Sequence, residues 1–137
     1  FSGEEWGLRG SRHLVSHLPH PERIWLMVNL DAVGGTSSES FYLIGRSKYP
    51  EIAERMKTAL GRELEKNIDP FAYESGSDFY PFSLSGIPAV GIWDAEYQAM
   101  HSPLSGAEKV SPDKLHLIAH TLRKFLFSLK KEDKIGG

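Results

Sequence analysis

The sequence of 137 residues contains no cysteine. This absence excludes a disulfide framework, a thiol nucleophile and any metal site built from thiolates. It leaves the cellular compartment open, because many secreted proteins also manage without disulfides. A metal site in this chain would have to use histidine and carboxylate ligands.

Long apolar runs and an excess of charge of one sign are missing as well. No apolar stretch approaches the roughly 20 residues that span a bilayer. The formal net charge is -2, and acidic and basic residues are interleaved. We therefore expect neither a nucleic-acid partner nor a membrane partner. The hydrophobic share of 40% and the charged share of 25% are typical of one globular domain with a real core.

Buried-type apolar runs alternate with amphipathic stripes along the chain. The patterns predict helices over residues 8–18, 50–66, 77–84 and 111–129, and strands over residues 24–30, 41–44 and 87–93. Ser77-Asp78 and Ser111 are the predicted N-caps of the last two helices. The run 24–30 is apolar at nearly every position, which is typical of a strand buried on both faces. The alternation predicts an α/β sandwich, with helices on both faces of a largely parallel sheet.

The predicted sheet is small, and the chain starts abruptly. Three strands are few for a sheet of this class. The first residue is Phe1 rather than Met, and residues 1–3 resemble the end of a strand that enters a loop. We therefore expect residues 1–137 to be the C-terminal part of one larger domain, with a sheet that is incomplete at the N-terminus. An unpaired sheet edge also predicts self-association.

Polar residues worth attention stand at the ends of the apolar runs. Glu4 and Glu5 follow the first residues, Asp31 follows the strand ending at residue 30, and His101 lies in the loop after the strand ending at residue 93. Strand ends share one edge of a parallel sheet, and ligands bind there. Carboxylates and a histidine at one edge suit a divalent metal, most plausibly zinc in a hydrolase.

Each of these residues also has an ordinary structural interpretation. Adjacent glutamates are common in the first turn of a helix, and an aspartate after a strand is usually a turn or cap residue. His101 would then be a surface loop residue. The remaining histidines fall on predicted helices or turns with polar neighbours, and we expect them to be solvated: His13, His17, His20, His116 and His120.

Four short blocks in a fixed order favour the metal-site interpretation. They are residues 1–11 (FSGEEWGLRGS), residues 29–34 (NLDAVG), residues 77–90 with SD at the start and GIPAV at the end, and residues 100–103 (MHSP). Together they resemble the co-catalytic zinc aminopeptidases, the metallopeptidase family that also includes enzymes like glutamate carboxypeptidase. The resemblance covers nearly the whole chain, and it implies a mixed, mostly parallel sheet between helices.

The resemblance also implies a role for each matching residue. Glu4 would be the general base, Glu5 and His101 would bind one zinc ion, and Asp31 would bind a second. Asp78 would be a nearby carboxylate that orients a ligand. The complete site would hold two zinc ions. Its bridging aspartate and one histidine belong to a block that we expect before the first residue of this chain.

Two departures from the family pattern concern substrate preference. Phe79 stands where the family usually has a histidine, and residues 103–106 (PLSG) lack the usual aspartate. The sequence thus predicts an aminopeptidase acting on peptides, with the chain alone inactive.

Two other functions stay open. One is a single-zinc acyltransferase like the glutaminyl cyclases, to which residues 10–14 (GSRHL) are similar. The other is a non-catalytic binding domain like that of the transferrin-receptor ectodomain.

Overall fold

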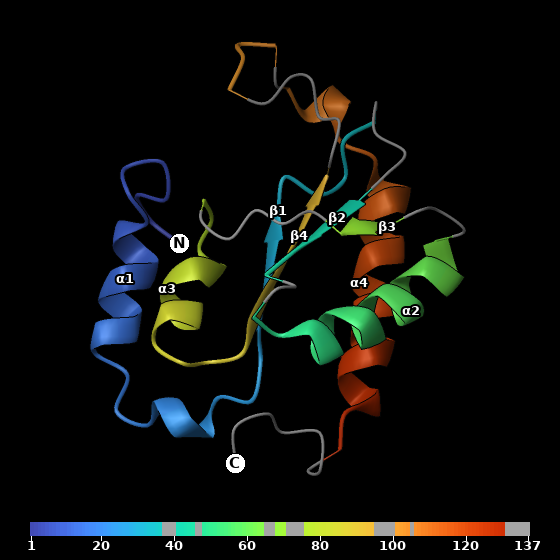
Figure 1. The fold of residues 1–137 in the computed structure, drawn as a ribbon. Coiled ribbons are helices and arrows are strands. Elements are labelled where there is room, and N and C mark those ends of the chain that lie inside the picture. Colours follow the sequence, from blue (N-terminus) through green and yellow to red (C-terminus); the bar gives the residue numbers. More distant parts are fainter. Residues whose placement is uncertain are drawn as a thin grey trace.

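The computed structural model describes residues 1–36, 41–45, 48–64, 68–70, 76–94, 101–104 and 106–130. A sheet with the strand order β1-β4-β2-β3 lies between two layers of helices (Figure 1). The strands are β1 (Met27–Asp31), β2 (Phe41–Ile44), β3 (Ile68–Pro70) and β4 (Ala89–Asp94). The helices are α1 (Arg9–Ser16), α2 (Pro50–Leu64), α3 (Phe79–Leu84) and α4 (Pro112–Ser128), with short 3-10 helices η1 (Pro21–Arg23) and η2 (Ala107–Lys109).

The two faces of the sheet are covered by different helix pairs. Helices α1 and α3 lie on one face, and α2 and α4 lie on the other (Figure 1). Each face of the sheet has its own hydrophobic core, and side chains of β4 contribute to both. Val90 and Ile92 pack in the core under α2 and α4, whereas Ala89 packs in the core under α3. The predicted three-layer α/β sandwich is confirmed.

The sheet is mixed, as the family resemblance implied. Strands β1 and β4 pair in parallel, β2 and β3 pair in parallel, and β2 and β4 pair antiparallel. In the parallel pair, Asp31 lies opposite Trp93. The carboxyl ends of β1 and β4 therefore share one edge of the sheet, where the site residues were expected.

Two strand predictions need correction. The sequence predicted no strand at Asp69 and Pro70, yet β3 is there. Both residue types are depleted in strands, and β3 lies at the sheet edge, where proline is tolerated. Strand β1 starts only at Met27 and is not buried on both faces; its Leu30 is 43% exposed. As an edge strand it is paired by β4 on one side only within the described residues.

The helix ends agree with the sequence in part. Ser111 caps α4 as predicted, since its hydroxyl accepts a hydrogen bond from the Lys114 amide. Residue 78 is the N-cap position of α3, but its side chain makes no capping hydrogen bond. None of the helices among the described residues combines the length and apolar character needed to cross a bilayer.

Candidate active site

The two adjacent glutamates lie in a tight turn that leads into α1. The amides of Gly7 and Leu8 both donate to the Glu4 carbonyl, at 3.2 and 2.9 Å. Gly3 and Leu8 have positive φ angles of 66° and 59°. A left-handed leucine is uncommon, and this one is buried at 7% exposure, so packing holds it there. The turn therefore fixes the backbone of the two glutamates before α1 begins.

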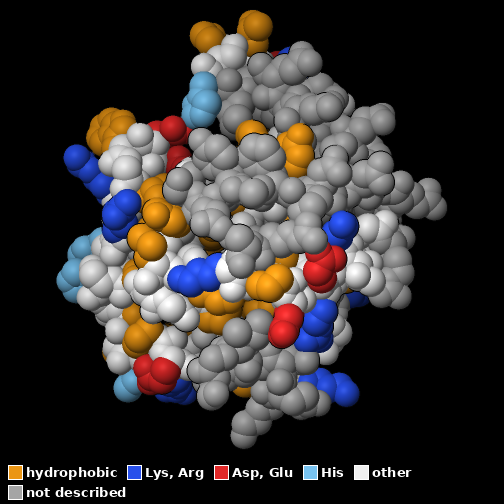
Figure 2. Space-filling model, viewed as in Figure 1, with side chains coloured by type: hydrophobic (Ala, Val, Ile, Leu, Met, Phe, Trp, Pro, Cys, Tyr) orange, Lys and Arg blue, Asp and Glu red, His pale blue; other side chains and the backbone are white. Residues whose placement is uncertain are grey.

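Glu5 and His101 meet although they are far apart in the sequence. Glu5 Oε1 lies 3.4 Å from His101 Nδ1, and the two side chains are 67% and 63% exposed. His101 has a φ of 58°, a left-handed conformation in which histidine is enriched among non-glycine residues. In the view of Figure 2, acidic side chains lie beside a histidine on the upper left of the molecule.

Glu4 lies within electrostatic range of all the other predicted site residues. Its half-buried carboxyl has a pKa above the ordinary value, first because burial disfavours the charged form. The carboxylates of Glu5, Asp31 and Asp78 raise this pKa further by repulsion, and His101 offsets part of the increase. Three other acidic side chains and one histidine are thus near enough to Glu4 to shift its pKa.

Asp31 is oriented by two polar side chains. Ser77 Oγ donates a hydrogen bond to Asp31 Oδ2, and Asn29 Nδ2 donates to Ser77 Oγ at 2.6 Å. The sequence prediction gave Ser77 only a helix-capping role. A signal was available at Asn29, which stands two positions before Asp31 and so on the same face of the strand. One oxygen of the predicted ligand is held in place by this relay.

Asp78 is nearly fully buried behind these residues, at 5% exposure. Its Oδ2 lies 3.5 Å from the backbone amine of Phe1, and its Oδ1 makes no hydrogen bond within the described residues. Its charge reaches Glu4. Its predicted role in orienting a metal ligand stays a prediction.

Comparison with known proteins decides the family. Residues 1–126 match the pattern of peptidase family M28. The chain belongs to this family. The aminopeptidase YwaD of Bacillus subtilis (strain 168) is 31% identical over 149 residues, which cover 98% of this chain and 32% of that protein.

Solved structures of aminopeptidases share the fold of this M28 chain. The aminopeptidase from Aneurinibacillus sp. strain AM-1 aligns with a TM-score of 0.80 at 25% identity, over 93% of this chain and 31% of its own. The zinc aminopeptidase BSAP from Bacillus subtilis aligns with a TM-score of 0.80 at 24% identity, over 96% of this chain and 35% of its own. The M28 chain therefore spans about a third of the length of these relatives.

The donor set of the M28 chain fits zinc. Two ligands about 2.0–2.1 Å from a tetrahedral zinc ion lie about 3.4 Å apart, and Glu5 Oε1 and His101 Nδ1 have that separation. Within the described ranges, no group of three or more histidine, aspartate or glutamate side chains is close enough to hold one ion. The role of this pair as part of a ligand set stays a prediction.

The remaining histidines are exposed, and Phe79 is buried. His13 and His17 contact each other on α1 at 4.2 Å between ring centroids, and His116 and His120 stack on α4 at 6.2 Å. All of them, and His20, are exposed, as predicted. Phe79, at 1% exposure, is in the hydrophobic core under α3. The ring of Phe79 therefore contributes to packing, and the predicted effect of this position on substrate preference stays a prediction.

Proposed function

We propose that this chain supplies part of the active site of a zinc-dependent aminopeptidase that removes N-terminal residues from peptides. The observation that carries the proposal is that Glu5 lies 3.4 Å from His101, while the charges of Glu5, Asp31, Asp78 and His101 all act on Glu4. Membership in peptidase family M28 and the aminopeptidase names of its relatives support the same reaction class.

Glu5 and His101 would hold one zinc ion, and Asp31 the other. A bridging aspartate and a further histidine would come from outside these 137 residues. Bound zinc polarises the scissile carbonyl and lowers the pKa of a coordinated water from 15.7 to about 7. Ser77 keeps Asp31 in one orientation while it binds.

Glu4 is suited to move the proton. It precedes Glu5, and adjacent residues cannot point the same way, so one carboxylate can bind the ion while the other faces the reacting water. Glu4 accepts the proton as the water attacks the peptide carbonyl, and it delivers that proton to the departing amine. Its raised pKa brings it closer to the neutral range in which a general base works best.

The test compares substrates on the longest natural polypeptide that contains this sequence. We expect hydrolysis of leucyl-p-nitroanilide, no hydrolysis of its N-acetyl form, loss of activity in a chelator and recovery with zinc. The N-acetyl substrate is the control, because an exopeptidase needs a free amine. Conversion of an N-terminal glutamine peptide to its cyclic product without hydrolysis would favour the acyltransferase. Bound peptide with no turnover would favour a binding domain.

We also propose that the 137-residue chain self-associates through the open edge of β1. Within the described residues, β1 has a strand neighbour on one side only, and the nearby Trp25 and Leu30 are 39% and 43% exposed. Such an edge is a template for pairing with another strand. We expect a concentration-dependent dimer or larger species in analytical ultracentrifugation.

A charged residue at this edge should oppose that pairing. Leu30→Lys is expected to shift the chain toward the monomer, whereas Leu104→Lys, at a site 72% exposed in the loop after His101, should leave association unchanged. A monodisperse monomer of the unaltered chain at about 100 μM would show that the edge is protected and the proposal wrong.

A further inference from the structure

The loop that follows Asp31 is held from two sides. This loop, residues 32–36, is called the Gly34 loop here. The Ser111 amide donates to the Gly34 carbonyl at 2.8 Å, and the Thr36 amide donates to the Lys109 carbonyl at 2.9 Å. Ser111 is the N-cap residue of α4, and Lys109 is the last residue of η2, two positions earlier. Backbone hydrogen bonds thus tie the Gly34 loop to the start of that helix.

The loop needs such support because its backbone is strained. Ala32, next to Asp31, has a φ of 48°, which costs a non-glycine residue conformational energy. Gly34 has a φ of 107°, and a Cβ atom there would lie 2.7 Å from Leu115 Cδ2. The chain therefore turns sharply directly after the predicted zinc ligand, and it passes close against α4.

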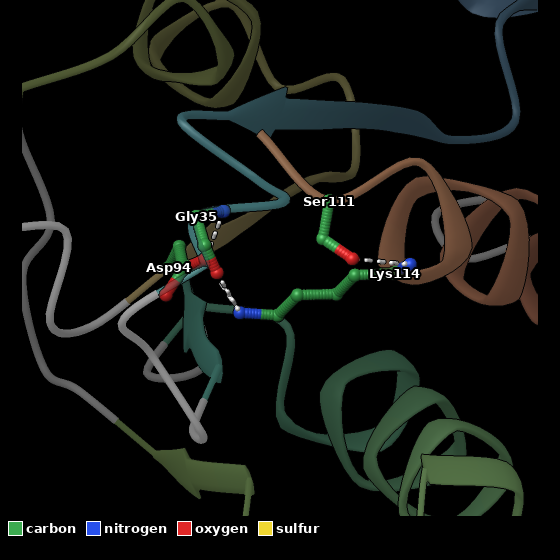
Figure 3. Close-up of polar contacts among 4 residues, drawn as sticks. All are labelled: Gly35, Asp94, Ser111 and Lys114. Carbon is green, nitrogen blue, oxygen red and sulfur yellow. Dashed lines mark hydrogen bonds and ion pairs between the residues drawn. The ribbon is translucent and has the colours of Figure 1, made fainter. Parts of the chain in front are cut away.

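A buried ion pair holds the centre of the loop (Figure 3). Lys114 Nζ lies 2.8 Å from Asp94 Oδ2 and donates to the Gly35 carbonyl at 2.9 Å. The same Asp94 oxygen accepts from the Gly35 amide at 2.8 Å. The backbone N–H and C=O of one loop residue are thus both bonded to one ion pair, which we call the Asp94–Lys114 clamp.

The clamp is shielded from water, which makes its two charges depend on each other. The Asp94 side chain is 0% exposed and that of Lys114 is 13% exposed. The Lys114 ammonium also lies 4.6 Å from the centroid of the Phe41 ring. Surface ion pairs hold geometry weakly, whereas a desolvated and hydrogen-bonded pair persists because either charge alone would be costly.

We propose that Asp94 and Lys114 are positioning residues that, through the Gly34 loop, fix the orientation in which Asp31 meets its metal ion. Asp31 is held at one end by the Ser77 hydrogen bond and at the other by its own backbone, which continues into the clamped loop. This inference rests on the proposed zinc site.

The test replaces both charges by apolar side chains of similar size, Asp94→Leu together with Lys114→Met. Exchanging the whole ion pair in this way leaves no unpaired buried charge, and it removes both bonds to Gly35. The control is Glu108→Leu with Lys109→Met, the same chemical change on exposed side chains beside the loop. Each protein is measured as the longest natural polypeptide that contains the sequence.

Four readouts separate a positioning role from a purely structural one. We expect the clamp variant to speed hydrogen exchange of the Gly35 amide at least about 10-fold and to weaken zinc affinity about 10-fold, at the low end for groups that orient metal ligands. The urea midpoint should fall, because the buried N–H and C=O of Gly35 lose their partners. In the absence of urea, kcat should fall more than KM rises. The control variant should match the unaltered protein in all of these.

Distinct outcomes overturn distinct claims. Faster exchange at Gly35 with unchanged zinc affinity would show that the clamp holds the loop without positioning Asp31. The unaltered protein could bind zinc and lose affinity in the clamp variant as expected, yet cleave no peptide. That result would overturn the proposed function but leave this inference standing. If the double variant does not fold, Asp94→Asn together with Lys114→Met replaces it. That pair leaves no buried charge and keeps an acceptor for the Gly35 amide, but it removes the donor to the Gly35 carbonyl, so unchanged zinc affinity in it would overturn the proposal.

Discussion

Glu4→Gln is expected to lower kcat by a factor of about 10²–10⁴ while leaving the zinc content unchanged. The amide has nearly the shape of the carboxylate, but it cannot accept a proton from the attacking water. Glu5 and His101, the pair 3.4 Å apart that would hold the ion, are left as they are. The measurement is steady-state hydrolysis of leucyl-p-nitroanilide with zinc determined on the same sample.

Two further glutamate-to-glutamine substitutions serve as controls for Glu4→Gln. Glu22→Gln makes the same change on a side chain that is 66% exposed and paired with His20, and it should keep kcat within about twofold. Glu5→Gln should instead lower the zinc content, since it removes a ligand. If Glu4→Gln keeps more than a tenth of kcat, another group is the base, and the role given to Glu4 is wrong.

Phe79→Ala is expected to lower the free energy of unfolding by about 3–5 kcal/mol. Phe79 is 1% exposed and packs in the core with Phe82, Ile87 and Ala89. Removing the ring takes away its apolar contacts and leaves a cavity that the close-packed sheet and α3 can fill only in part. Against a total of about 5–15 kcal/mol for a typical domain, this is a large share. Urea unfolding followed by circular dichroism measures it.

Phe127→Ala provides the matched control for this substitution. Phe127 is 82% exposed on α4, so the same atoms are removed from a side chain that already faces water. The expected change is within about 0.5 kcal/mol. Equal losses of unfolding free energy in the two variants would show that the ring of Phe79 is not in the core. Position 79 would then be a candidate again for setting substrate preference.

The parts of the fold with strong local signals were predictable from the sequence. Pro50 opens α2, Ser111 caps α4, and the apolar run that contains β4 forms a strand buried on both faces. Strand β3 was missed because its aspartate and proline argue against a strand, and only its pairing with β2 makes it one. Tertiary contacts decided that element, and no local pattern records them.

The candidate site, like the fold, was predictable from the sequence only in part. Glu4, Glu5 and Asp31 could be proposed because they stand in short blocks with a family pattern, and the structure brings their charges together. Ser77 was assigned a capping role because a serine before a helix usually has one, yet its hydroxyl bonds to a residue 46 positions away. The partners of Lys114 lie 20 and 79 positions from it, so no motif could contain them.

The distances along the chain that the clamp spans set an order of events during synthesis. Lys114 follows Gly35 by 79 residues, and ribosomes add roughly 5–20 residues per second, so about 4–16 s pass between them. Throughout that interval Asp31 has been made, but the cation that secures the turn behind it has not. The bonds from Lys114 to Gly35 and Asp94 can therefore form only after the start of α4 has been translated and has emerged. A nascent chain arrested before that helix contains Asp31 without the clamp.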